Sequence, residues 1–412
     1  MSTPAGSPAA VSVRLLRDRS GGQRVTNIEL FFDLVYVFAV TQLSHFLLTY
    51  ATVRGALQAA LLLSMVWLVW SYTMWMTNWL DPERIEVRLL LVVLMLVSLA
   101  MSAALPHAFA GWGWVVGTAY AVQQVGRSVF MVAVLRGPLQ RNYERILAWA
   151  TVSGIFAVAG GLVYGAPRGV LWVLAAATDV GGAIAGFATP GLGRSLTADW
   201  TIEGGHMAER CQAFILIALG ESIVIIGATL SGMPHITATD VAAFVIAFAG
   251  SVALWWLYFD RSAGASAEVI AASDDPGRLG RSAYSLIHPL MVAGIIVTAA
   301  SDEKILALPS TTATAAAHAA RAMSGSTGAA RPSSARTATP ASLVHGMTRH
   351  TTNLKAACPA RNSAGPPRII QAAAVAVVDG SARIFSSLAA VTMTQQPHGH
   401  RGRASRGGAH QA

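Results

Sequence analysis

The segment of residues 28–50 reads IELFFDLVYVFAVTQLSHFLLTY, an apolar stretch whose only charged side chains are Glu29 and Asp33. A run of about 20 predominantly apolar residues is long enough to cross the hydrocarbon core of a bilayer as an α-helix. The segment therefore predicts a transmembrane helix. Because a carboxylate is costly in lipid, the segment also predicts that its two acids have a partner or a task.

The chain repeats this pattern as far as residue 300. Eight more apolar segments of spanning length follow, at 56–79, 87–107, 112–135, 145–164, 169–189, 208–230, 238–259 and 281–300. Hydrophobic residues make up 54% of the chain and charged residues only 12%, about half the share usual in soluble domains. We therefore predict an all-α polytopic membrane protein with about nine transmembrane helices.

Three regions follow from composition: a polar leader (1–26), a transmembrane helical domain (27–302) and a low-complexity basic tail (303–412). The leader lacks the apolar stretch of a signal peptide, which indicates an uncleaved cytoplasmic segment. Residues 1–309 hold 18 Lys and Arg against 19 Asp and Glu, whereas residues 310–412 hold 11 against one. The net charge of +9 thus belongs to the tail and does not indicate a nucleic-acid partner.

The tail permits two interpretations. It is rich in Ala, Ser, Thr, Arg, Gly and Pro and contains a single aromatic residue, Phe385, so it cannot build a hydrophobic core. One interpretation is a disordered basic tail. The other, which we favour, is a shifted reading frame in a GC-rich gene, because off-frame GC-rich codons encode these same amino acids.

Basic residues are distributed unevenly between the two sides that nine spans create. With the N-terminus inside, the cytoplasmic segments hold 14 arginines, and the opposite side holds 3 basic residues, Arg54, Arg168 and Lys304. Cytoplasmic loops of membrane proteins carry an excess of Lys and Arg. We therefore predict a cytoplasmic N-terminus. The alternation also supports the number of spans, because one missed helix would scramble it.

Tryptophans and glycines indicate how the helices face their surroundings. Four tryptophans recur along the segment 56–79, and we expect them to face lipid and the membrane interface. They are Trp67, Trp70, Trp75 and Trp79. Small residues four apart allow helices to approach closely. Such pairs are Gly113 with Gly117, Gly161 with Gly165, and Gly182 with Gly186.

The first predicted helix carries polar side chains on one face. Glu29, Asp33 and Tyr36 follow one another at steps of four and three residues. Two carboxylates one turn apart repel each other unless a cation lies between them or one is protonated. Two interpretations stay open. One is a cation or proton site that involves Asp33. The other is a structural ion pair at the cytoplasmic rim, with Glu29 in contact with water and Arg24 as the neutralising residue.

The seventh predicted helix is the richest in charge. His206, Arg210 and Glu221 share one face, and Glu209 lies beside them. Arg210 and Glu221 are about three turns apart, so they cannot pair with each other. Glu221 lies deep in apolar sequence and must face another helix or a water-filled cavity, or be protonated. We favour a functional role for it over a structural pair.

Two further charges lie within predicted spans. Arg127 and Asp179 occupy the fourth and sixth segments, and each needs a partner in the membrane. We expect Arg127 to pair with Asp33, Asp179 or Glu221. His288 lies near a span end, where a hydrogen-bonded interface residue is more common than a ligand.

Three motifs resemble one known family. They are RVTNIELFFDLVYVFAVTQLSH at 24–45, HMAER at 206–210 followed by IALGESIV at 217–224, and YSLIHP at 284–289. Together they resemble the bacterial low temperature requirement A (LtrA) family over about residues 22–302. The resemblance implies a multi-pass protein of the bacterial plasma (inner) membrane, linked by name to growth in the cold. The motif residues fall on positions already singled out: Glu29, Asp33, His206, Glu209, Arg210, Glu221 and His288.

These observations leave two main hypotheses for the function. The first is a transporter that moves or couples protons or small cations through its buried carboxylates. The second is a non-transporting sensor or scaffold in cold adaptation, whose buried charges are structural ion pairs. The sequence lacks a nucleotide-binding loop, a nucleophile elbow and an HExxH motif, and Cys211 and Cys358 form no metal or redox pair. We therefore expect no enzymatic activity, no cofactor and no bound metal, and the oligomeric state stays open.

Overall fold

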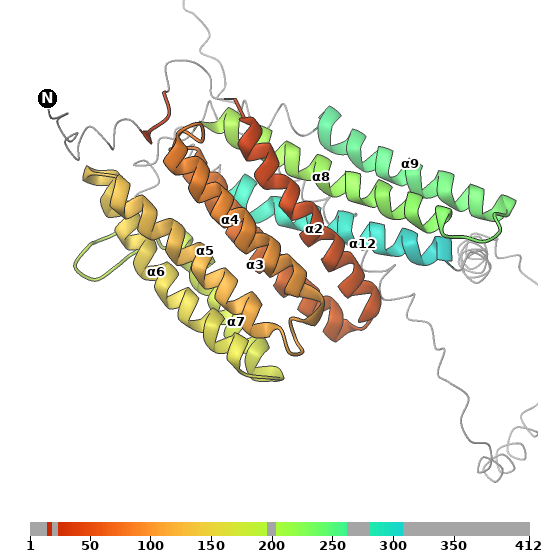
Figure 1. The fold of residues 1–412 in the computed structure, drawn as a ribbon, viewed down its shortest axis with the longest axis horizontal. Coiled ribbons are helices and arrows are strands. Elements are labelled where there is room, and N and C mark those ends of the chain that lie inside the picture. The colour runs from red at the N-terminus through yellow and green to blue at the C-terminus, as the bar shows by residue number, and fades with distance from the viewer. Residues whose placement is uncertain (1–14, 19–23, 196–202, 262–280, 308–412) are drawn as a thin grey trace, which may run out of the picture.

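The computed structural model describes residues 15–18, 24–195, 203–261 and 281–307 (Figure 1). Its principal helices are α2 (Asn27–Thr49), α3 (Val53–Thr77), α4 (Ile85–Ala104), α5 (Gly113–Val134), α6 (Gly137–Leu162), α7 (Ala166–Ile184), α8 (Gly204–Ser231), α9 (Ala238–Arg261) and α12 (His288–Ala307). A short 3₁₀ turn, η1 (Leu105–His107), follows α4, and a π-helical turn, η3 (Arg281–Ile287), precedes α12. Each of the nine predicted segments coincides with one of these helices. The all-α fold class is therefore confirmed.

Seven of these helical segments are long and apolar enough to cross a membrane: α2, α3, α4 with η1, α6, α8, α9, and η3 with α12. The segments α5 and α7 are not among them, and both carry buried polar residues. Gln123, Gln124 and Arg127 lie on α5, and Asp179 lies on α7. Since α5 and α7 both pack against α6 and α3, these polar side chains face protein instead of lipid.

Only some boundaries of the three predicted regions can be compared with the structure. The last helix continues to Ala307, five residues past the predicted domain boundary at 302. The rest of the tail, 308–412, and most of the leader lie outside the described residues. The disordered and frameshifted interpretations of the tail therefore both stay predictions.

The helix ends meet at two opposite ends of the bundle. Where α3 ends and α8 begins, the side-chain amide of Asn78 donates to the backbone oxygen of Glu203 at 3.0 Å. At the other end, Arg168 at the start of α7 donates to the backbone oxygen of Ala108, just after η1, at 2.6 Å. These contacts agree with helices that cross the bundle in alternating directions, α5 and α7 included.

Helix α3 lies at the centre of the bundle, where it packs against α2, α5, α7, α8 and α12. The prediction that the tryptophans of this segment face lipid was therefore wrong for Trp67 and Trp70. Trp67 and Trp70 are only 2% and 0% exposed. Their indole N–H groups donate inward, from Trp67 to the backbone oxygen of Ser285 at 2.8 Å and from Trp70 to Asp33 Oδ1 at 2.7 Å. A buried tryptophan needs an acceptor for its N–H group, and polar residues on neighbouring helices supply it.

The predicted close approach of helices at small residues is confirmed where α5 meets α6. A Cβ atom added to Gly117 would lie 2.2 Å from the backbone oxygen of Ala157, and one added to Gly161 would lie 2.7 Å from that of Gly113. The two backbones can approach this closely only because these positions lack a side chain. Gly165 has a different role. It is the N-cap residue of α7, and its positive φ of 73° is a backbone conformation that favours glycine.

We expect Gly117→Ala to lower the free energy of unfolding by about 1–3 kcal/mol, because the added methyl group must push α5 and α6 apart. Gly126→Ala on the same helix is the matched control, since nothing lies within 4 Å of its added Cβ. Thermal unfolding of both variants in detergent micelles measures the difference. Equal stabilities would contradict the close packing.

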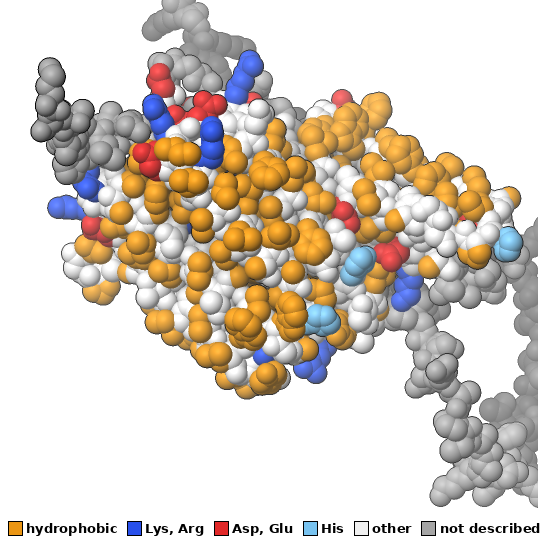
Figure 2. Space-filling model, in the orientation of Figure 1, with side chains coloured by type: hydrophobic (Ala, Val, Ile, Leu, Met, Phe, Trp, Pro, Cys, Tyr) orange, Lys and Arg blue, Asp and Glu red, His pale blue; other side chains and the backbone are white. Residues whose placement is uncertain are grey.

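The outer surface of the bundle is largely apolar. Figure 2 shows hydrophobic side chains over much of the visible face, with one group of charged side chains at its upper edge and others at its left and lower edges. Leu96 on α4, Ile155 on α6 and Ile246 on α9 are 67%, 62% and 72% exposed. An extensive exposed apolar surface is unsuited to water and matches the hydrocarbon of a membrane.

Candidate functional site

Two buried polar clusters lie inside the bundle. The first, called here the charged cluster, consists of five side chains from the leader, α2 and α8: Arg17, Glu29, Asp33, His206 and Arg210. The start of α2 positions its first acid. Thr26 caps the helix, and its backbone N–H and hydroxyl donate to Glu29 Oε2 at 3.0 and 2.9 Å in a capping box.

Arg210 lies between the two carboxylates of α2. Its Nη1 contacts Glu29 Oε1 at 3.1 Å, and its Nη2 and Nε contact the two oxygens of Asp33 at 2.6 and 3.0 Å. Arg17 Nη2 contacts the other oxygen of Glu29 at 2.7 Å. Two guanidinium groups thus balance two carboxylates, and the bidentate contact with Asp33 is the strong form of this pair.

The hydrogen bonds around His206 define its tautomer. Asn78 Oδ1 accepts from the backbone N–H of Glu203 at 3.1 Å, so the other end of the amide is the donor. This Nδ2 lies 3.2 Å from His206 Nδ1, which must therefore accept. The proton of the ring is then assigned to Nε2, which donates to Glu29 Oε1 at 2.8 Å and also lies 3.2 Å from Arg17 Nη2. His206 is neutral in this arrangement, and the charged cluster has no net charge.

Two details of the predicted rim site were wrong. Arg17, and not Arg24, neutralises Glu29; Arg24 contributes only its backbone oxygen, which accepts from Arg17 at 3.2 Å. Glu29 is 0% exposed and therefore does not contact water. The leader closes over the end of the bundle, because Leu16 pairs with Leu80 in an isolated β-bridge.

Two other predicted site residues lie outside the charged cluster. Tyr36 shares the face of Glu29 and Asp33, as predicted, and its hydroxyl bonds with Ser98 on α4 at 3.0 Å. Glu209 points to the exposed surface, where it accepts from the backbone N–H of Val25 at 3.1 Å. Glu209 thus fastens the leader and takes no part in a buried site.

Glu221 is buried on α8 but is not joined to either cluster. Its side chain is 5% exposed, and within the described residues it makes no hydrogen bond or ion pair. Arg210, as predicted from the spacing, pairs with other acids. A functional role for Glu221 stays a prediction without geometric support.

We expect Glu221→Gln to keep or raise the thermal stability, since the substitution removes a buried charge without breaking a described contact. Asp33→Asn is the comparison, because that substitution weakens the pair with Arg210. The unfolding temperatures of the two variants and the wild type in detergent micelles measure these changes in stability. A loss in Glu221→Gln as large as that in Asp33→Asn would reveal a partner of Glu221.

The second cluster surrounds Asp179 on α7. One of its carboxylate oxygens, Oδ2, accepts from three donors: the hydroxyl of Tyr120, Gln124 Nε2 at 2.7 Å and Ser153 Oγ at 2.9 Å. Tyr120 and Gln124 come from α5, and Ser153 comes from α6, which packs against both α5 and α7. Asp179 is 1% exposed, so its charge is stabilised by neutral hydrogen-bond donors and not by water.

The predicted ion pair of Arg127 is wrong. Within the described residues Arg127 makes no ion pair with Asp33, Asp179 or Glu221. It donates to Gln124 Oε1 and to Thr73 Oγ1, the latter at 3.4 Å, and lies over the ring of Tyr72. Gln124 therefore connects Arg127 to Asp179, because its amide donates to the acid and its oxygen accepts from the arginine.

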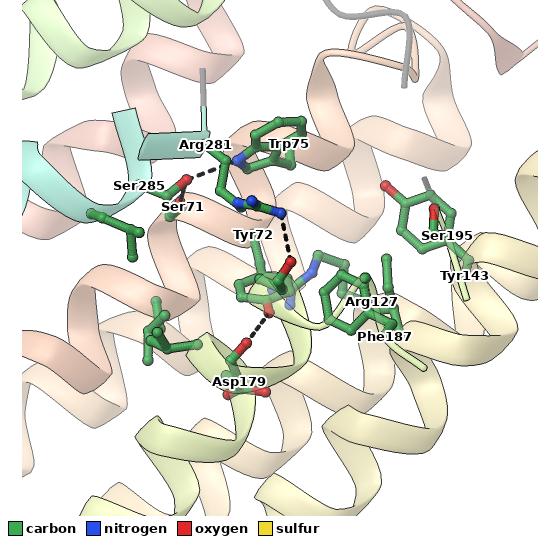
Figure 3. A pocket seen from close by; sticks show the side chains of 16 residues that line it. Ser71, Tyr72, Trp75, Arg127, Tyr143, Asp179, Phe187, Ser195, Arg281 and Ser285 are labelled. Atoms are coloured by element: carbon green, nitrogen blue, oxygen red, sulfur yellow. Dashed lines mark hydrogen bonds between the residues drawn. The ribbon is translucent and has the colours of Figure 1, made fainter. Parts of the chain in front are cut away.

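A cavity of about 100 Å³ adjoins this second cluster, between α3, α5, α6, α7 and η3 (Figure 3). Its polar lining includes Tyr72, Arg127, Asp179, Arg281 and Ser285. Residues after the end of α7 also line it, which places its outer part at the end of the bundle where α7 ends. This cavity, and not the charged cluster, offers space for a solute.

Arg281 and Ser285 on η3 were not predicted as site residues. Arg281 Nη1 donates to the backbone oxygen of Ala183 at 2.6 Å, while its buried Nε has no partner among the described residues. Ser285 Oγ accepts from Trp75 and Ser71 of α3, each at 2.9 Å. π-Helical turns are rare and occur frequently at functional sites. The available signal was the YSLIHP motif at 284–289, which overlaps η3.

His288 lies outside both clusters. Its Nε2 is 3.0 Å from the hydroxyl of Tyr258 on α9, and its Nδ1 is 2.7 Å from the backbone oxygen of Ala283. Both ring nitrogens therefore have partners within the protein. This agrees with an interface residue that joins α9 to the start of α12.

Comparisons with known proteins agree with the motifs. The family described as "Bacterial low temperature requirement A protein (LtrA)" matches residues 24–393, which reaches past the predicted boundary at 302. The chain is 36% identical over 311 residues to "Uncharacterized protein RA0937" of Rhizobium meliloti (strain 1021). The matched region covers 74% of this chain and 75% of that protein. No solved structure matches the chain significantly. Together with its membrane-spanning helices, these matches identify the chain as a multi-pass integral membrane protein that belongs to the bacterial LtrA family.

Proposed function

We propose that this protein is a secondary transporter of the bacterial plasma membrane and that it couples the movement of a small solute to protons through Asp179. The observation that carries this proposal is the cavity, which brings one buried carboxylate and two arginines together inside a bundle of membrane helices. Ionisable residues at this depth in a membrane are rare and are usually retained for transport or proton transfer.

Asp179 suits a coupling role better than the other buried acids. It lines the cavity, whereas Glu29 and Asp33 are closed off by Arg17 and Arg210. Adding a proton to Asp179 would remove its negative charge and so weaken the hydrogen bonds that hold Tyr120, Gln124 and Ser153 together. Gln124 would then be free to turn, and Arg127 with it. Protonation of Asp179 would thereby change the position of Arg127 in the cavity lining.

Small metal cations are a less suitable coupling ion. The oxygen of Asp179 nearest to the neighbouring helices is already occupied by three donors, and both arginines of the cavity repel cations. A cation site needs several free oxygen ligands. Protons are therefore the coupling ion that we propose.

The charged cluster supports a second candidate, a non-transporting sensor or scaffold. Each carboxylate of this cluster is paired with arginine, and the cluster has no net charge, which is the expected form of a structural latch. In the transporter proposal the same latch holds the leader, α2, α3 and α8 together at one end. The difference between the candidates is whether anything passes through the cavity.

We further propose that the N-terminus faces the cytoplasm. The imbalance of 14 arginines against 3 basic residues supports this orientation. It places the leader, the charged cluster and the outer part of the cavity on the cytoplasmic side. No catalytic residue, cofactor or metal forms part of the proposal.

Uptake into proteoliposomes tests the transporter proposal. The purified full-length protein is reconstituted and given a pH gradient, a sodium gradient or neither. A panel of labelled solutes then covers inorganic cations, amino acids, carboxylates and phosphate. We expect at least one solute to accumulate under the pH gradient and not under the sodium gradient alone. No accumulation of any class above that of empty liposomes would favour the scaffold.

A further inference from the structure

We propose that the cavity binds a small carboxylate anion between Arg127 and Arg281 and that the charge of Asp179 opposes this binding. The proposal deepens the proposed function, since it names the solute class of the same cavity. Figure 3 shows the two arginines reaching the cavity from different elements, Arg127 from α5 and Arg281 from η3, with the ring of Tyr72 beside Arg127.

The first argument is charge. Within the described residues neither Arg127 nor Arg281 forms an ion pair, and both line the cavity. Asp179 is the only described acid in the lining, and its Oδ2 is occupied by Tyr120, Gln124 and Ser153. Two guanidinium groups against one carboxylate give the described lining a charge of +1. A buried excess charge favours a ligand of the opposite sign.

The second argument is the unused hydrogen-bonding capacity of Arg281. Its Nη1 donates to the backbone oxygen of Ala183, but its buried Nε has no partner among the described residues. A buried N–H group without an acceptor costs about 1–3 kcal/mol. A carboxylate fits this edge of a guanidinium group, because its two oxygens match a pair of parallel N–H donors.

The third argument is size and the character of the remaining walls. A cavity of about 100 Å³ holds only a small solute, since one water molecule occupies about 30 Å³. Leu68, Ile146 and Phe187 contribute apolar surface beside the arginines. A short organic acid such as acetate would place its carboxylate between the arginines and its methyl group against these side chains. A fully hydrated inorganic ion would find fewer polar partners.

The charge of Asp179 gives the coupling its sign. The titratable and charged groups around Asp179 come from four elements: Tyr72 of α3, Tyr120 and Arg127 of α5, Tyr143 of α6, and Arg281 of η3. While Asp179 is ionised, it offsets one of the two arginines. Protonation raises the charge of the described lining from +1 to +2, so the anion binds more tightly. Proton and anion therefore bind together, as in symport.

Binding of ¹⁴C-acetate to the purified full-length protein in detergent, measured by scintillation proximity, tests this proposal without requiring transport. We expect saturable binding that Arg281→Gln weakens at least tenfold and Arg281→Lys weakens less. Arg88→Gln is the matched control, because Arg88 is exposed on α4. Binding to the wild type should also tighten as the pH is lowered within the range where acetate stays ionised. In Asp179→Asn the affinity should be high and independent of pH.

Each outcome bears on the proposal separately from transport. No saturable binding of acetate, or equal binding in Arg281→Gln and the wild type, would overturn it. Stronger competition by phosphate or chloride than by a second carboxylate, propionate, would overturn the assigned solute class. Uptake of a different solute in the proteoliposome panel, with no acetate binding, would leave the transporter proposal standing and remove this one. Acetate binding without uptake of any solute would support this proposal and contradict the transporter proposal.

Discussion

Replacing Arg210 with methionine is expected to lower the free energy of unfolding by about 3–5 kcal/mol. The substitution leaves Glu29 and Asp33 buried, at 0% exposure each, with three of their ionic contacts removed. Arg17 still compensates Glu29, but Asp33 retains only the indole N–H of Trp70. Leaving a buried carboxylate without a counter-ion is among the most destabilising changes that a single substitution can make. Thermal unfolding in detergent micelles measures the loss.

Two further variants make this prediction specific to charge. Arg88→Met changes an exposed arginine on α4 and should alter stability by about 0.5 kcal/mol or less. Combining Arg210→Met with Asp33→Asn removes the uncompensated charge, while Arg17 still pairs with Glu29, and should recover much of the loss, since a neutral group is easier to bury. If this double variant is as unstable as Arg210→Met alone, packing of the arginine and not its charge holds the bundle together.

The second large effect is expected on transport. Asp179→Asn should reduce uptake driven by a pH gradient by about 100-fold, the size of effect that follows when a proton-transferring group is removed. Asparagine has nearly the same shape and can still accept hydrogen bonds from Ser153 and Tyr120, but it cannot gain or lose a proton in this pH range. The variant should therefore remain folded and bind solute, yet fail to accumulate it.

The matched control is Asp260→Asn on α9. Asp260 is exposed, accepts from the indole of Trp256 at 3.1 Å and is not part of the cavity lining. Its substitution should leave uptake at the wild-type level. Wild-type uptake in Asp179→Asn, measured in the same proteoliposomes, would show that the coupling proton is carried elsewhere. Glu221 would then be the next acid to test.

The sequence predicted which residues are unusual far better than it predicted their partners. Insertion cost singled out Asp33, Arg127, Asp179 and Glu221, and each of them is buried in the bundle. The pairing of Arg127 was wrong, however, because Gln124 lies between it and Asp179. Spacing along one helix tells which side chains share a face, but the partner depends on which face of another helix lies opposite.

Two arginines show most clearly what could not be predicted from the sequence. Arg17 lies in the leader and Arg281 at the start of the last span, where a basic residue is common and carries little energetic penalty. Neither residue therefore appeared unusual in the sequence. In the fold, Arg17 becomes the counter-ion of Glu29, and Arg281 becomes part of the cavity lining. Trp67 and Trp70 of α3 were misplaced for a related reason, since their spacing did not show that α3 is central.

By itself the sequence determined the fold class, the positions of the membrane helices and the set of charges that need compensation. These properties depend on the free energy of moving each segment from water into lipid, which is a sum over local side chains. Only the tertiary structure decided that Arg210 joins Glu29 and Asp33 into a closed cluster, and that Arg127, Asp179 and Arg281 surround a cavity. Those outcomes depend on how helices distant in the chain pack against one another, and hydrophobic burial alone does not specify which polar groups meet.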